Sequence, residues 1–411
     1  MKKFAYYTLV LLSCLTILSC NSNNEERTAL AGLWIGKIIM QEQEMPFKLL
    51  IEEDGNDQIT ATVINGVEKI VLDEITRTGD SLHIPMNVFD ISLDLLIKKN
   101  TLTGSYTKHY EENYVLPVTF SKGNERFTIK DEAANTSDFG GTWEVTFIYP
   151  EEQDTTKAVG IFEQNGTDVT GTFLTPLGDY RYLAGVVDGN ELKLSTFDGN
   201  HAFLFKAIIQ DDGTLKGDFY SGKEWYESWS GFRNLEAALP SPDSLTYLKK
   251  GYDRVYFEFP DLAGNNYKFP NDSLKGKVVI LQIFGTWCPN CMDETKFLSD
   301  WYEQNKEKDV AIIGLAYEAK DDFDYAKGRV EKMINKWNVG YNFLIAGHND
   351  KEAASQSLPM LNKIISFPTM VIIDKNGEVA RIHTGFSGPG TGKYYDDFVA
   401  EFTKTMDALL Q

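Results

Sequence analysis

Two cysteines at the junction of a strand and a helix constrain this chain more than any other feature. The apolar run Val278–Phe284 predicts a buried parallel strand. Residues 292 to about 306 then place large side chains at three- and four-residue spacing, which predicts a helix. Cys288 and Cys291 lie between them, near the helix start, where the dipole and free N–H groups favour a thiolate. The pattern predicts a redox-active pair.

Two other interpretations of the cysteine pair stay open at this point. A structural disulfide is one, although a C-x-x-C loop constrains little of the unfolded chain's entropy. A zinc site is the other, but it would need a second Cys or His pair at ligand spacing. The other cysteines are Cys14 and Cys20, and the five histidines form no such pair. We therefore expect neither a metal nor a cofactor.

The stretch Phe284-Gly-Thr-Trp-Cys-Pro-Asn-Cys resembles the active site of thioredoxin-fold proteins, most closely the membrane-anchored thiol-disulfide oxidoreductases of the TlpA/ResA type. Two further features carry the resemblance. Phe367-Pro368 precedes a short apolar run, where this family keeps a cis-proline facing the redox pair. Glu294 follows Cys291 by one helical turn, where the family has a glutamate beneath the sulfurs. The resemblance implies an α/β thioredoxin-like domain over residues 251–411.

The same resemblance implies a protein-disulfide reductase, a thiol-disulfide oxidoreductase in which the two cysteines have different roles. Cys288, expected to be exposed, attacks a client disulfide, and the more buried Cys291 resolves the mixed disulfide. Minimal thioredoxins carry a buried aspartate six residues before the first cysteine, but Gln282 stands there and cannot titrate. Glu294 is therefore the candidate base, with a pKa that burial would raise. The residues expected to contact the client are Trp287, Pro289, Phe367 and Pro368.

The dipeptide between the cysteines bears on the direction of electron flow. A histidine after Pro289 would stabilise the thiolate and make an oxidant, whereas Asn290 carries no charge. The sequence therefore favours a reductant. The implied partners are envelope client proteins with disulfides and an upstream membrane dithiol donor. Cytochrome c maturation is one process to which such a reductant can contribute.

The N-terminus predicts export to the cell envelope. Residues 1–19 combine a basic start with a short apolar segment, which is typical of a signal peptide. Ser19 directly before Cys20 resembles a bacterial lipobox, so Cys20 would carry a lipid and residues 20–29 would form a tether. The alternative is an ordinary signal peptide. The expected location is periplasm-facing and lipid-anchored, with the membrane leaflet left open.

Residues 30–122 and 138–235 form an internal repeat. Gly32-Leu-Trp34 returns as Gly141-Thr-Trp143, and Leu102-Thr-Gly104-Ser-Tyr106 returns as Leu215-Lys-Gly217-Asp-Phe219. Each copy reads as about eight short strands separated by tight turns. This predicts two antiparallel all-β modules, lipocalin-like barrels or sandwiches, joined by a linker over residues 236–250 to the redox domain.

The function of the repeats is not evident from their residues. Trp225, Tyr226 and Trp229 could line a ligand mouth, or they could be packing residues. An alternative function is therefore a ligand- or partner-binding lipoprotein, whose redox domain serves one client or senses redox state. The formal net charge of −20 argues against a nucleic-acid partner, because such proteins need basic surface.

Overall fold

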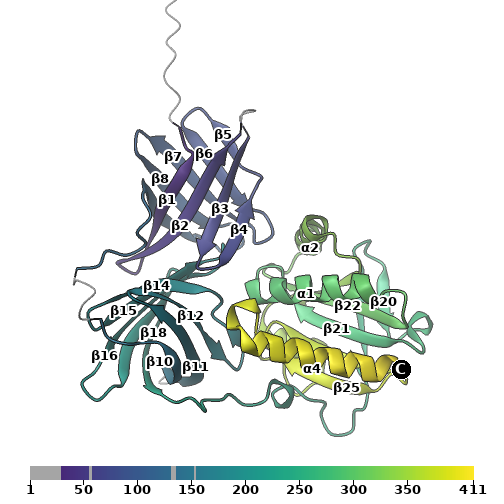
Figure 1. Cartoon of the computed structure of the whole chain (residues 1–411). Helices are drawn as coiled ribbons and strands as arrows, with labels where there is room; N and C mark the ends of the chain where they lie inside the picture. Colours follow the sequence, from purple (N-terminus) through teal and green to yellow (C-terminus); the bar gives the residue numbers. More distant parts are fainter. Residues whose placement is uncertain (1–28, 55–57, 131–135, 152–153) are drawn as a thin grey trace, which may run out of the picture.

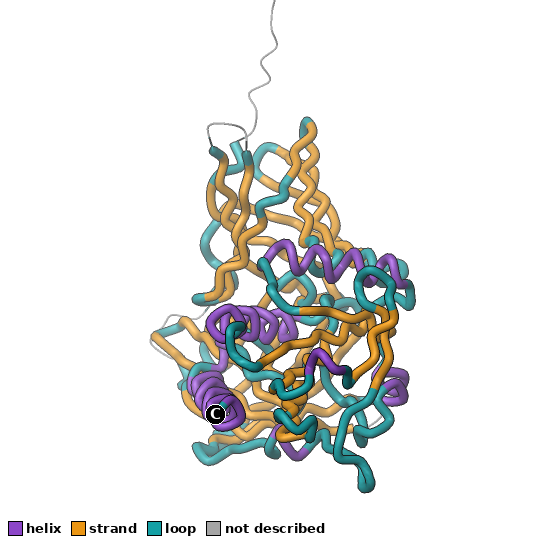
Figure 2. Tube along the Cα trace, turned by 90° about the vertical axis from the view of Figure 1, so that its right-hand side faces the viewer, coloured by secondary structure: helices purple, strands orange, loops and turns teal. Residues whose placement is uncertain are grey.

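The structure is a computed structural model that describes residues 29–54, 58–130, 136–151 and 154–411. It has three parts: a first β module (β1–β9), a second β module (β10–β18) and a redox domain (β19–α4). Figure 1 shows the first module stacked on the second, with the redox domain beside both, and Figure 2 shows the redox domain lying across them. The predicted signal peptide, Cys20 and nearly all of the tether lie outside the described residues.

The first β module is an antiparallel meander in which β1 pairs with both β2 and β9, giving the order β4-β3-β2-β1-β9-β8-β7-β6-β5. It has nine strands rather than about eight, because the three-residue β5 adds a short edge. The strands are β1 (Gly32–Met40), β2 (Gln43–Glu53), β3 (Ile59–Asn65), β4 (Glu68–Leu72), β5 (Thr76–Thr78), β6 (Ser81–Met86), β7 (Ile91–Lys98), β8 (Thr101–Lys108) and β9 (Val115–Lys122).

The second β module is a closed barrel. Its sheet order is β11-β10-β18-β17-β16-β15-β14-β12-β13, and β11 also pairs with β12. Eight strands thus complete the ring, while the two-residue β13 extends β12. The strands are β10 (Gly141–Tyr149), β11 (Asp154–Asn165), β12 (Asp168–Thr175), β13 (Gly178–Asp179), β14 (Leu183–Asp188), β15 (Glu191–Phe197), β16 (Ala202–Ile209), β17 (Leu215–Ser221) and β18 (Trp225–Arg233). The predicted antiparallel all-β modules are confirmed.

The repeated sequence motifs make the same contacts in both modules. The indole N–H groups of Trp34 and Trp143 each donate to the carbonyl four residues earlier, at 2.8 Å. A Cβ at Gly104 or Gly217 would lie 1.8 or 2.2 Å from a backbone oxygen of the neighbouring strand. Only glycine fits these two strand positions, so the repeat preserves a close backbone approach.

The two β modules share a core. Phe197, from the end of β15, lies among the aromatic rings of the first module, with centroids 4.5 Å from Phe47 and 5.3 Å from Tyr106. The Asn65 side chain donates to the Phe197 carbonyl at 2.8 Å. The modules therefore form one continuous body, because the second fills the end of the first.

The redox domain has a five-stranded mixed sheet of order β23-β22-β21-β24-β25. Its centre, β21, is parallel to β22 and buried along its whole length, which confirms the buried strand predicted over Val278–Phe284. The elements are β19 (Phe257–Pro260), β20 (Asn266–Phe269), β21 (Val278–Phe284), α1 (Pro289–Asn305), β22 (Val310–Glu318), α2 (Phe323–Trp337), β23 (Asn342–His348), α3 (Lys351–Ser357), β24 (Thr369–Ile373), β25 (Val379–Thr384) and α4 (Lys393–Leu410). The expected thioredoxin-like α/β fold is confirmed.

A proline sets one end of each of two helices in the redox domain. The helix α1 begins at Pro289 rather than near residue 292, since proline suits the first helical position. The helix α3 starts after the N-cap Asp350 and ends at Ser357. Its end is set by Pro359, because the residue before a proline avoids helical backbone angles.

The segment between the second module and the redox domain packs on the latter. Asp243 in the short turn η2 (Pro242–Ser244) pairs with Arg381 at 2.9 Å and with His383 at 3.0 Å. Leu248 forms an isolated antiparallel bridge with Leu361. In the described part of the chain, no helix is long and apolar enough to span a membrane.

Candidate active site

The dithiol lies at the N-terminus of α1. Cys288 is the N-cap residue, and its Sγ accepts a hydrogen bond from the Cys291 backbone N–H at 3.2 Å. The Phe367–Pro368 peptide bond is cis, and the Cys288 thiol donates to the Phe367 carbonyl at 3.4 Å. Both cysteines are free thiols. The strand–turn–helix junction thus brings a reduced pair against the loop that contains the cis-proline.

The expectation that Cys288 is exposed is wrong. Its exposed fraction is 6%, against 0% for Cys291. The second β module covers the turn around it: the Asn200 side chain donates to the Trp287 carbonyl at 2.7 Å, and the Asn290 side chain donates to the Asp179 carbonyl at 3.1 Å. The sequence of the redox domain alone could not predict these contacts, because they come from another module.

Glu294 is fully buried beside the dithiol. Its Oε2 accepts a hydrogen bond from the Gln282 side chain at 3.1 Å, while its Oε1 has no hydrogen-bond partner within the described part of the chain. Burial raises the pKa of Glu294 to about 8. Burial also raises the pKa of the Cys291 thiol well above its usual value, and the nearby Cys288 and Glu294 add to that rise. A carboxyl with such a pKa can both take and return a proton near neutral pH.

Gln282 organises the polar groups beneath the sulfurs, a role that the sequence analysis missed. Its amide N–H₂ donates to Glu294 and, at 3.0 Å, to the Thr295 hydroxyl, and its oxygen accepts from the Tyr341 hydroxyl at 3.0 Å. Thr295 in turn donates to the Cys291 carbonyl at 2.8 Å. The available signal was one polar residue inside the otherwise apolar run Val278–Phe284.

Glu318, at the end of β22, holds the turn that precedes Cys288. Its carboxylate accepts hydrogen bonds from the Thr286 backbone N–H at 2.9 Å and from the Thr286 hydroxyl at 2.8 Å. Burial raises the pKa of Glu318 to about 7. Nothing in the local sequence singled out this residue, because its contact with Thr286 spans 32 positions.

The residues expected to contact a client surround Cys288. Trp287 is half-buried, and its indole N–H donates to the Tyr317 carbonyl at 2.9 Å. Its ring meets the Phe367 ring edge to face at a centroid distance of 5.7 Å. Pro289, Phe367 and Pro368 are buried. The structure therefore gathers all four residues at one place, under the cover of the second β module.

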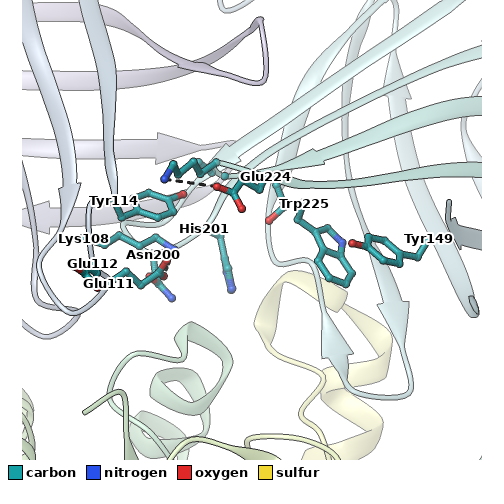
Figure 3. A pocket seen from close by; sticks show the side chains of 13 residues that line it. Lys108, Glu111, Glu112, Tyr114, Tyr149, Asn200, His201, Glu224 and Trp225 are labelled. Atoms are coloured by element: carbon teal, nitrogen blue, oxygen red, sulfur yellow. Dashed lines mark hydrogen bonds and ion pairs between the residues drawn. The ribbon is translucent and has the colours of Figure 1, made fainter. Parts of the chain in front are cut away.

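The aromatic cluster near the end of the second module divides into two environments. Trp229 is buried in the barrel core, whereas Trp225 is exposed and stacks on Tyr149 with ring centroids 4.6 Å apart. Figure 3 shows this stacked pair in the wall of a pocket of about 470 Å³ between the two β modules. Trp229 is therefore a packing residue, whereas Trp225 lines a pocket. No three His, Cys, Asp or Glu side chains gather as a metal site among the residues described.

Known proteins with similar sequences identify the family to which the redox domain is related. The Redoxin family model matches residues 250–397. The thiol-disulfide oxidoreductase ResA of Bacillus thuringiensis is 31% identical over 132 residues, which cover 32% of this chain and 68% of the relative. The chain belongs to the ResA family. ResA of Halalkalibacterium halodurans is 27% identical over 138 residues, covering 33% of this chain and 69% of the relative.

Solved structures of similar proteins include a thiol:disulfide interchange protein from Chlorobium tepidum TLS. It is 19% identical, with a TM-score of 0.30, and the match covers 43% of this chain and 99% of that one. A putative protein disulfide isomerase from Bacteroides thetaiotaomicron is also 19% identical, with a TM-score of 0.30, covering 40% of this chain and 92% of that one. This ResA-family protein is a thiol-disulfide oxidoreductase with a thioredoxin-like domain.

Proposed function

We propose that this protein reduces disulfide bonds of client proteins in the cell envelope. The observation that carries the proposal is the free Cys288/Cys291 pair at the start of α1, with the buried Glu294 beside it. The first sulfur receives a backbone N–H, and the second lies in the core next to a proton acceptor. This asymmetry suits a nucleophile and a resolving thiol.

The reaction transfers two electrons from the dithiol to the client. The Cys288 thiolate attacks one sulfur of the client disulfide, the sulfur–sulfur bond breaks, and the other client sulfur leaves as a thiolate. Glu294 then accepts the proton of Cys291, and the new thiolate attacks the Cys288 sulfur. The second client thiolate leaves, the client gains two protons overall, and the enzyme is left with a Cys288–Cys291 disulfide. An upstream dithiol donor reduces that disulfide again.

The charge of the turn favours reduction over oxidation. Asn290, between the cysteines, is neutral and donates its amide to the Asp179 carbonyl rather than to a sulfur. A cation at that position would stabilise the thiolate and make the pair oxidising. The pair therefore has no cation at this position to stabilise its reduced form. This suits an electron donor, because the reduced form of a donor must give up its electrons readily.

The place of action rests on the N-terminal sequence. Residues 1–19 have the pattern of a signal peptide, and Ser19-Cys20 has the pattern of a lipid-attachment site. A lipid at Cys20 would hold the protein at the envelope membrane, near both an upstream donor and its clients. Ligand capture by the β modules has less support, because aromatic side chains such as the stacked pair Phe205 and Phe219 fill the interior of the second barrel.

Insulin reduction by the full chain tests the proposal. With dithiothreitol as the electron source, the wild type should accelerate precipitation of the insulin B chain at least about tenfold over dithiothreitol alone, because a positioned thiolate attacks faster than a free thiol. Cys288→Ser should abolish the acceleration. The control Thr403→Ala, at an exposed position of the C-terminal helix α4, should keep it. A wild type no faster than dithiothreitol would contradict the proposal.

A further inference from the structure

A loop of the second β module lies on the rim of the dithiol. We call residues 175–181 the docking loop; it connects β12 to β14. The Leu177 carbonyl accepts a hydrogen bond from the Ser366 hydroxyl at 2.6 Å, two residues before the cis-proline. The Asp179 carboxylate accepts from the Gly388 N–H at 2.7 Å, and its carbonyl accepts from Asn290. The loop therefore bridges the two stretches of chain that flank the sulfurs.

The fit between the docking loop and the redox domain leaves no room for another chain. A Cβ built on Gly385 would lie 3.0 Å from the Leu177 carbonyl carbon, and one built on Gly178 would lie 3.1 Å from the Asn290 amide nitrogen. At Gly385 the backbone of the redox domain meets the backbone of the loop directly, and at Gly178 the loop backbone meets the Asn290 side chain. A client segment cannot lie beside Ser366 while the loop is there.

Asn200 closes the rim on the other side. It follows β15 and donates to the carbonyl of Trp287, the residue before Cys288, while it accepts a hydrogen bond from the Tyr110 hydroxyl of the first module. Asn200 and His201 also line the pocket between the β modules (Figure 3). Contacts from the β modules thus engage the chain on both sides of Cys288.

Arg181, the last residue of the docking loop, ties the three parts of the molecule together. Its guanidinium pairs with Glu68 of the first module at 2.5 Å, with Asp198 of the second module at 3.1 Å and with Asp293 of α1. It also donates to the Pro289 carbonyl at 3.3 Å. The arginine side chain is only 6% exposed. Removing one partner while the junction stays closed would leave an uncompensated buried charge, so single substitutions here should weaken the docked arrangement.

We propose that the docking loop is an intramolecular competitor for the client site, so that it decides which disulfides reach Cys288. A protein client must contact the residues flanking the attacking sulfur, and those residues are already bonded to Leu177, Asp179, Arg181 and Asn200. Small disulfides reach the sulfur in the docked form, whereas a folded client reaches it only after the second module separates from the rim. The inference rests on the proposed client reduction for its biological meaning, but the occlusion itself is independent of it.

Thiol alkylation of the reduced full chain tests the occlusion without any client. N-ethylmaleimide and a maleimide carrying a polyethylene glycol of about 5 kDa share one reactive group and differ in size. Mass spectrometry assigns the modified cysteine, and the readout is the ratio of the large-reagent rate to the small-reagent rate at Cys288. A cysteine-containing peptide gives the ratio for an unhindered thiol. We expect the wild-type ratio to be at least about tenfold below that reference, because the large reagent reacts only with the minor undocked population.

Two variants weaken the junction from opposite sides. Arg181→Gln removes the central cation, whereas Asp293→Asn removes only its partner on α1 and leaves Glu68 and Asp198 paired with the arginine. Both should raise the ratio toward the peptide reference. Arg233→Gln is the matched control, because Arg233 pairs with Asp138 at an exposed site of the second module, and it should leave the ratio unchanged.

Either of two results would overturn the proposal. One is a wild-type ratio equal to that of the peptide, which would mean that Cys288 is open to large partners. The other is a low wild-type ratio that Asp293→Asn and Arg181→Gln both leave unchanged. If Arg181→Gln fails to fold, as circular dichroism would show, the wild type and Asp293→Asn still decide. A protein that proved inactive on insulin would give the same alkylation ratios, so failure of the proposed reduction is a separate outcome.

Discussion

The two sulfurs of the dithiol have different surroundings although only two residues separate them. Cys288 Sγ accepts a hydrogen bond from the Cys291 N–H at the start of α1, and its thiol donates to the Phe367 carbonyl. Cys291 has no exposed surface, and burial raises the pKa of its thiol. At the scale of single residues, we therefore expect the first sulfur to be the nucleophile and the second to be the resolving group.

The order of attack predicts which variant traps clients. Cys291→Ser should accumulate mixed disulfides with envelope proteins, because Cys288 still attacks but nothing resolves the intermediate. Cys288→Ser should accumulate none. Non-reducing electrophoresis of cell extracts measures both, and equal trapping by the two variants would contradict the assignment.

Glu294 should control the resolving step. Glu294→Gln keeps the shape of the side chain but cannot accept a proton, so we expect turnover to fall about ten- to hundredfold. Because the pKa of Glu294 is about 8, the wild-type resolution rate should rise as pH increases through that value. The variant should lack this rise, while its initial attack through Cys288 changes less. Stopped-flow mixing separates the two steps, and identical pH profiles of resolution would exclude the role.

The stability of the same variant provides an independent check. The pKa of Glu294 is higher in the folded chain than the ordinary glutamate value of 4.5, so the folded state binds more protons between about pH 4.5 and 8. The free energy of unfolding should therefore decrease as pH rises through that window, by up to about 1.4 kcal/mol per pH unit from this group. Glu294→Gln should lose this contribution. Urea unfolding at several pH values measures the difference.

At the scale of elements, the sequence pattern could predict those parts of the redox site that are formed by residues close together in the chain. The buried strand, the turn with both cysteines and the start of α1 are consecutive in sequence, so one stretch specified them. Contacts between distant elements had no such signal. Tyr341 reaches Gln282 across 59 positions, and Arg181 reaches Glu68 across 113. The position of Glu294 beneath the sulfurs could be inferred from its helical spacing, but the Gln282 amide that holds its carboxyl group could not.

The repeated glycines give an element-scale prediction. In Gly104→Ala the new methyl group would lie 1.8 Å from a carbonyl oxygen of β7, so β8 must shift. We expect the free energy of unfolding of the β modules to fall by about 1–3 kcal/mol, as for other overpacked sites. Gly328→Ala in α2 is the control, since nothing lies within 4 Å of its new Cβ; there we expect a gain of up to about 1 kcal/mol. Thermal unfolding that leaves Gly104→Ala as stable as the wild type would contradict the account.

At the scale of the whole molecule, the second β module covers the part of the redox domain that contains Cys288. The sequence could predict three bodies, because repeats and turn signals recur within each module. It could not predict that the second module packs over Cys288, since the surfaces involved come from loops with no repeat and no periodicity. The prediction that Cys288 is exposed was wrong for that reason.

Membrane attachment is a further prediction at the scale of the whole chain. Ser19-Cys20 follows an apolar segment and precedes a polar one, so Cys20 should carry the lipid. Metabolic labelling with an alkyne fatty acid should mark the wild type and not Cys20→Ala, while the control Cys14→Ala should still be labelled. Wild-type protein without label would leave only an ordinary signal peptide.

The reduction potential of the Cys288/Cys291 pair tests the central claim, that this protein donates electrons to client disulfides, most directly. Equilibration of the full chain with dithiothreitol buffers of graded ratio, followed by thiol counting, gives the value. A reductant should have a potential near that of thioredoxin, about −270 mV. A value near about −120 mV, as in the strongly oxidising DsbA, would contradict the account.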